Sequence, residues 1–120
     1  MPSEIRDGTL AVRTSHEDSV WTLSLSGELD LANTETLAGE LEKAECDGAG
    51  LIVLDMTSLE FIDSTGIALL VSTHRRLNGD TECFQLVGSE GTAVRRVMEL
   101  TGLNTELPFA SPNGGSAKAG

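Results

Sequence analysis

The hydrophobic pattern of the chain is strongest between residues 51 and 77. Residues 51–54 form a continuous apolar run that ends at Asp55, and a run this short is typical of a strand buried on both faces of a parallel sheet. A turn is expected at 56–60. Beyond it, four residues recur at the spacing of one helix face, namely Ile67, Leu70, Val71 and His74. The segment therefore predicts a strand, a tight connection and a helix, with a polar tetrad at 63–66 where the helix begins.

The pattern before this segment predicts a hairpin. Residues 1–7 are polar and are expected to be frayed. Apolar and polar residues alternate at 9–14 and again at 20–26, which indicates two half-buried strands joined by a turn at 16–19. Gly27 is expected to break the second strand, because glycine in a strand interior weakens it.

The remaining elements complete an α/β pattern. Asn33 or Thr34 can cap a helix that extends to residue 46, a further strand is expected at 82–87, and a third helix is expected to end at Gly102. The buried side of that third helix is predicted from Val94, Val97 and Met98, with Thr101 as a further candidate. Residues 107–109 suit a short edge strand or a packed staple. The order β-β-α-β-α-β-α predicts a mixed sheet with an opening antiparallel hairpin, layered with helices.

Length and composition indicate one domain at residues 1–110 and a disordered tail at 111–120, because the tail has no apolar residue larger than Ala. The net charge of −11 and the scarcity of aromatic residues disfavour nucleic acid as a partner. No apolar run approaches the length of a membrane helix, and the first residues lack the apolar core of a signal peptide. We therefore expect a cytoplasmic protein in which Cys46 and Cys83 are both free thiols.

The tetrad at 63–66 is the candidate functional site, and its simplest interpretation is a helix N-cap. A nucleophilic serine is disfavoured, since the string IDSTG is not a GxSxG elbow and the two histidines lie elsewhere. A phosphate-binding loop lacks its glycines and lysine. Phosphorylation of the serine hydroxyl remains, because a phosphate at a helix N-terminus is favoured by the helix dipole and adds charge at a surface that a partner contacts. Neither a metal site nor a cofactor is expected.

Four motifs in this order resemble those of the STAS-domain family, and specifically its stand-alone bacterial anti-sigma factor antagonists. They are GELD at 27–30, IVLD at 52–55, FIDSTG at 61–66 and VRRVMELTGL at 94–103. Together they span about residues 9–109. Thr65 stands where some members have a second serine, and the C-terminal tail looks particular to this chain.

The resemblance implies a regulatory protein and not an enzyme. Its members bind an anti-sigma factor that is a serine-protein kinase, and so release a sigma factor; the kinase then phosphorylates the antagonist, and a PP2C-type phosphatase reverses this. By position, Ser64 matches the phosphorylated serine. The resemblance also implies a partner-binding surface formed by Gly27, Glu28, Leu29, Asp30, Asp63, Thr65 and Gly66.

Two alternatives stay open on the sequence alone. The chain could be a STAS module of a larger signalling scaffold, or a module that binds a small ligand or nucleotide at the same helix start. For the antagonist, the expected state is a monomer or a weak dimer.

Overall fold

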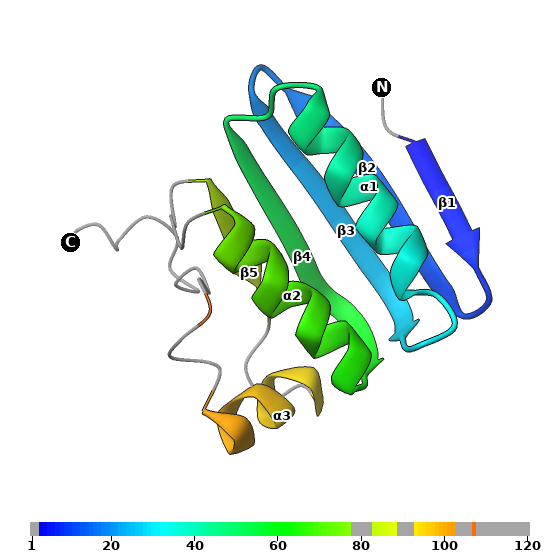
Figure 1. Cartoon of the computed structure of the whole chain (residues 1–120). Coiled ribbons are helices and arrows are strands. Elements are labelled where there is room, and N and C mark those ends of the chain that lie inside the picture. The colour runs from blue at the N-terminus through cyan, green and yellow to red at the C-terminus, as the bar shows by residue number, and fades with distance from the viewer. Residues whose placement is uncertain (1–2, 78–82, 89–92, 103–106, 108–120) are drawn as a thin grey trace.

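A computed structural model describes residues 3–77, 83–88, 93–102 and 107 of the chain. Along the chain the elements are β1 (Ser3–Asp7), β2 (Leu10–Glu17), β3 (Val20–Leu29), α1 (Thr34–Cys46), β4 (Leu51–Ile62), α2 (Ser64–Arg76), β5 (Phe84–Val87) and α3 (Ala93–Thr101). The five strands form one sheet in the order β1-β2-β3-β4-β5 (Figure 1). The first three strands pair antiparallel, and β3, β4 and β5 pair parallel. The predicted mixed α/β sheet is therefore confirmed.

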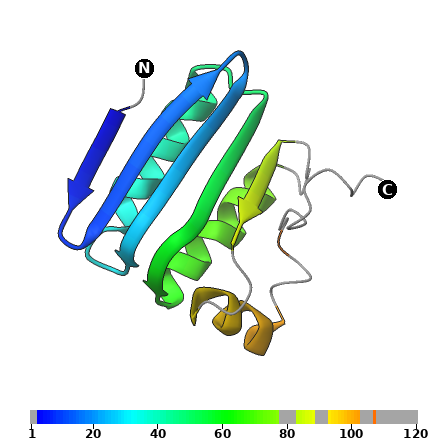
Figure 2. The ribbon, with the colours of Figure 1, turned by 180° about the vertical axis from the view of Figure 1, so that it is seen from behind.

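Helices α1 and α2 lie on the same face of this sheet (Figure 1), and α3 lies at one end of it, below β5 in both views. Seen from behind, the strands lie in front of both helices (Figure 2). The hydrophobic core fills the space between the sheet and the two helices, because alternate strand residues point to that face. Its fully buried large side chains are Leu10, Leu23, Leu25, Leu29, Leu37, Leu41, Leu54, Met56, Leu70, Phe84, Leu86 and Met98.

The expectation of fraying is wrong for residues 3–7, because Ser3–Asp7 form the edge strand β1, while residues 1–2 lie outside the described residues. Residue Ile5 pairs with Val12 of β2, and Glu4 forms ion pairs with Arg6 at 2.8 Å and Arg13 at 3.3 Å. The sequence pattern does not show this strand, since an edge strand with much of its surface in solvent does not need an apolar face.

The predicted break at Gly27 and the predicted turn at 56–60 are also wrong. Strand β3 continues to Leu29 and β4 continues to Ile62, and the two remain paired to the end, with Leu29 opposite Ile62. The pairing shifts register between Ser24 and Ser26 and again between Gly27 and Glu28. Such shifts interrupt the strict alternation of side chains between the two faces of the sheet. The sequence there therefore lacks the two-residue pattern of a strand, although the strands remain paired.

The predicted helices form with small differences at their faces. On α2, Leu70 and Thr73 are buried, whereas Val71 and His74 are only half-buried. On α3, Val94 and Met98 are buried as expected and Val97 is half-buried. Thr101 is exposed instead, and its hydroxyl donates to the carbonyl of Val97 at 2.9 Å.

Some of the sequence predictions fall outside the described residues. The proposed tail at 111–120 lies there, as do Pro108 and Phe109, while Leu107 is buried. Cys46 is an exposed thiol and Cys83 a half-buried one, and no disulfide joins them. In the described part of the chain, no helix combines the length and apolar character that crossing a bilayer requires.

Gly27 should be among the least replaceable residues of the sheet. Its φ is +90°, and a Cβ added there would lie 1.8 Å from the backbone oxygen of Thr9. We expect Gly27→Ala to lower the free energy of unfolding by about 3 kcal/mol or more, since backbone strain and a backbone clash combine. Gly48→Ala is the matched control, with φ +84° and open space around the added carbon. It should lose about 1 kcal/mol, and equal losses in urea unfolding of the two variants would show that the contact with Thr9 is unimportant.

Candidate functional site

Ser64 is the first residue of α2, and its side chain is exposed to solvent. The preceding Asp63 is the N-cap of the helix, with extended backbone angles of φ −103° and ψ −175°. The chain reaches this point directly from β4, which ends at Ile62. The serine hydroxyl therefore stands at the junction of a buried strand and the N-terminus of a helix, where backbone N–H groups lack partners within the helix.

The carboxylate of Asp63 joins two segments that are distant in sequence. Its Oδ1 accepts hydrogen bonds from the backbone N–H groups of Thr65 (2.9 Å) and Gly66 (3.1 Å), and also from the Thr65 hydroxyl. Its Oδ2 accepts a bond from the N–H of Leu31 at 3.1 Å. The hydrogen bond from the Thr65 hydroxyl, together with those from the three N–H groups, holds the pKa of Asp63 below its ordinary value of 3.8. The N-cap interpretation is confirmed, and the same side chain also anchors the loop between β3 and α1.

That loop is held by its own hydrogen bonds. The side chain of Asn33 is buried, accepting from the N–H of Asp30 at 2.9 Å and donating to the carbonyl of Glu28 at 3.0 Å. The carboxylate of Asp30 accepts from the N–H of Ala32 at 3.0 Å. Asn33 occupies the N-cap position of α1, but its side chain makes no capping bond to that helix. It stabilises the loop instead, so the loop has little freedom to move relative to β3.

Gly66 brings the start of α2 close to the end of β3. It is buried, and a Cβ added there would lie 2.7 Å from Cγ1 of Ile62 and 2.9 Å from Cδ2 of Leu29. The carbonyl of Leu29 in turn accepts the N–H of Asp63 at 3.1 Å. Glycine at this position therefore has a packing reason, independent of any partner.

The residues that the family resemblance assigns to a partner surface fall into two groups. Asp63 and Thr65 contact each other beside the exposed Ser64 at the start of α2, and Asp30 lies in the loop that the Leu31 N–H joins to Asp63. The others are committed to the sheet or pack beneath it. Leu29 and Gly66 are buried and Gly27 packs against Thr9, while Glu28 is exposed on β3 opposite Phe61.

Two exposed apolar side chains at this site are absent from the sequence-based set. Leu31 is 73% exposed and Phe61 is 48% exposed. Leu31 lies within the loop that Asp63 anchors, and Phe61 lies two residues before Asp63. A leucine that follows an aspartate just beyond the end of a strand is a weak signal by itself, because many leucines in such positions are buried.

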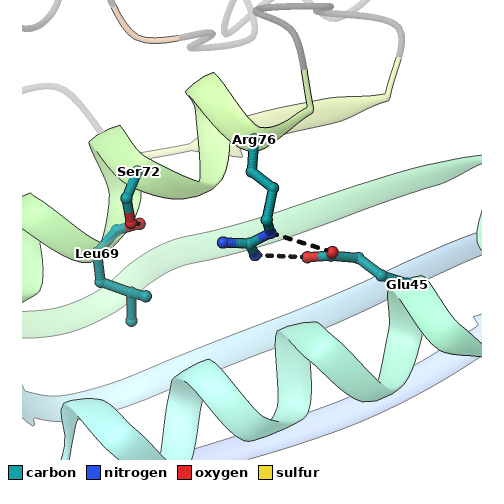
Figure 3. Close-up of polar contacts among 4 residues, drawn as sticks. All are labelled: Glu45, Leu69, Ser72 and Arg76. Carbon is teal, nitrogen blue, oxygen red and sulfur yellow. Dashed lines mark hydrogen bonds and ion pairs between the residues drawn. The ribbon is translucent and has the colours of Figure 1, made fainter.

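At the other end of α2, an ion pair connects the two helices (Figure 3). Arg76 donates from Nε to Glu45 Oε1 at 3.2 Å and from a terminal nitrogen to Oε2 at 2.7 Å. The hydrogen bond to Glu45 raises the pKa of Arg76. Arg76 thus forms a structural contact between α1 and α2. In the part of the chain that the structure describes, no group of three or more His, Cys, Asp or Glu side chains is arranged to hold a metal ion.

The titration of Asp63 should depend on Thr65. Because the folded-state pKa of Asp63 is lowered, the stability that its charged form contributes is present above pH 3.8 and is lost as the pH falls through the lower folded-state value. Thr65→Val removes the donor with the largest influence, so the pKa of Asp63 should move back toward 3.8. The measurement is the carboxyl ¹³C chemical shift of Asp63, followed as the pH falls from about 6 in the parent and in Thr65→Val. An unchanged titration in Thr65→Val would show that the hydroxyl bond does not form in solution.

The comparisons with known proteins agree with this architecture. The family model described as "Mlab, STAS domain" matches residues 12–109. The anti-sigma-F factor antagonist RsfB of Mycobacterium tuberculosis is 28% identical over 96 residues, which are 80% of this chain and 77% of RsfB.

Two solved structures superimpose on most of the chain. An anti-sigma factor antagonist from Mycobacterium paratuberculosis has a TM-score of 0.72 and 28% identity, covering 83% of this chain and 84% of that one. The anti-sigma factor antagonist SpoIIAA in its unphosphorylated form has a TM-score of 0.66 and 25% identity, covering 85% of this chain and 90% of that one. Since the family model matches more than half of the residues, the chain belongs to the STAS-domain family.

Proposed function

We propose that this protein is an anti-sigma factor antagonist whose binding to its partner is switched by phosphorylation of Ser64. In the unphosphorylated state it binds an anti-sigma factor that is a serine-protein kinase and so releases a sigma factor. Phosphorylation of Ser64 ends that binding, and a PP2C-type phosphatase restores it. The observation that carries the proposal is the exposed hydroxyl of Ser64 at the start of α2, in a domain whose relatives are named as anti-sigma factor antagonists.

The local geometry favours Ser64 over Thr65 as the phosphorylated residue. The hydroxyl of Thr65 donates to Asp63 and its side chain is half-buried, so a kinase would have to break that bond to reach it. Ser64 is exposed, and its hydroxyl makes no hydrogen bond to any other residue that the structure describes. A phosphate on Ser64 would also lie at the positive end of the helix dipole, where the folded chain tolerates negative charge.

Phosphorylation should therefore act on the interface and leave the fold unchanged. The first turn of α2 is already capped by Asp63, and Gly66 is packed against β3 and β4. The loop after β3 is held by Asn33 and Asp63. Since these contacts lie beneath the serine, the added phosphate projects from a surface that has no need to rearrange. We also propose that the protein is cytoplasmic, that it acts by binding and not by catalysis, and that it is a monomer or a weak dimer.

The test uses recombinant anti-sigma factor kinases of the source organism, each tested separately with the full chain and ATP. The cognate kinase should add one phosphate to the parent protein and none to Ser64→Ala, with the site mapped by fragmentation mass spectrometry. Thr65→Val is the matched control and should still be labelled on Ser64. Stoichiometric labelling of Ser64→Ala would contradict the assignment of this residue.

Binding to the same kinase should fall when the protein is phosphorylated. We expect calorimetry to show a loss of about a hundredfold, or about 3 kcal/mol, because the interface must lose contacts and accommodate a doubly charged group. Amide exchange of the free protein should be the same in both states outside the first turn of α2. Equal affinities would reject the switch, and exchange changes throughout the sheet would show a conformational mechanism.

A further inference from the structure

Two apolar side chains on the segments around the proposed switch are exposed to solvent. Leu31 is 73% exposed in a tight turn, and Phe61 is 48% exposed near the end of β4. The inward positions at this end of the sheet are taken by Leu29 and Ile62, both of which are buried. Leu31 and about half of Phe61 therefore present apolar area to water on the segments that surround Ser64.

The backbone that carries both residues is held in place. The N–H of Leu31 donates to Asp63, and the residues on either side of it belong to the turn that Asp30 and Asn33 stabilise. Phe61 is fixed by the ladder between β3 and β4, where it lies opposite the exposed Glu28. Side chains on a preorganised backbone lose less entropy when a partner covers them, and this favours their use as binding anchors.

The charge around these two residues indicates the kind of surface that fits them. The segments that carry them, 27–36 and 58–68, contain Glu28, Asp30, Glu35, Glu60 and Asp63 and contain no Lys, Arg or His. A complementary partner would present an apolar recess for the two side chains and basic groups around it. A second copy of this chain does not fit, because its own acidic segments would meet these.

We propose that Leu31 and Phe61 are the anchors by which the anti-sigma factor holds this protein. The inference rests on the proposed function and adds the residues that supply affinity. Ser64 directly follows Asp63 in the chain. The carboxylate of Asp63 holds the N–H of Leu31, and Phe61 lies two residues before Asp63. A phosphate at Ser64 would therefore have to enter the water-excluded edge of an apolar contact. The basic groups that suit the carboxylates lie around this apolar contact and not within it, so the phosphate would lose water there without gaining a paired partner, which is strongly unfavourable.

The test measures the affinity of the unphosphorylated full chain for the recombinant anti-sigma factor kinases of the source organism by calorimetry. Leu31→Ala and Phe61→Ala should each weaken binding by about tenfold or more, the loss expected when a central anchor is truncated. Leu31→Met keeps the apolar volume and should bind nearly as well as the parent. Thermal unfolding should give nearly the same Tm for Leu31→Ala as for the parent, because the side chain is mostly in solvent.

Val20→Ala is the control for a general loss of apolar surface. Val20 is 38% exposed and pairs with Leu51 at the start of β4, whereas Phe61 lies at the end of the same strand. This variant should bind like the parent. If the parent binds none of the kinases, the proposed function fails. If the parent binds and both alanine variants at Leu31 and Phe61 bind equally well, or if Val20→Ala weakens binding as much as they do, the anchor assignment alone is overturned.

Discussion

The carboxylate of Asp63 is the interaction on which the candidate site depends. One oxygen caps the first turn of α2, and the other holds the N–H of Leu31 in the loop after β3. Backbone N–H groups at a helix start and in a loop need partners, and one charged side chain supplies several of them at once. Two segments that are about thirty residues apart thus share one anchor. Any group attached to Ser64 would therefore lie next to a backbone in which the start of α2 and the loop after β3 are already joined.

The parallel pairing of β3 and β4 explains why these segments meet. The carboxyl ends of neighbouring parallel strands lie at the same edge of a sheet, so the connections that follow them begin side by side. Here the strands end at Leu29 and Ile62, which are register partners. Gly66 then allows α2 to approach that edge more closely than a residue with a Cβ would. The site is thus a consequence of sheet topology combined with one close helix approach.

A rigid platform of this kind suits regulation by a covalent charge. Internal hydrogen bonds hold the backbone around Ser64. The ion pair between Glu45 and Arg76 connects the C-terminal ends of α1 and α2. Under the proposed function, a phosphate on Ser64 would therefore change the surface more than the structure. If Leu31 and Phe61 anchor the partner as proposed, the added charge would act strongly, because a charge that is well solvated in water is costly inside an apolar contact.

The sequence alone determined the elements with strong periodicity and the chemistry of the tetrad. The apolar run at 51–54, the helix from Ser64 and the N-cap at Asp63 follow from local residue preferences. Tertiary structure decided the rest. The polar edge strand β1 and the late part of β4 exist because neighbouring strands satisfy their backbones, and no local pattern records that pairing. The bond from Leu31 to Asp63 and the exposure of Leu31 likewise depend on contacts between distant segments. Hydrophobicity marks a residue as apolar, but only the folded arrangement decides whether it packs in the core or faces a partner.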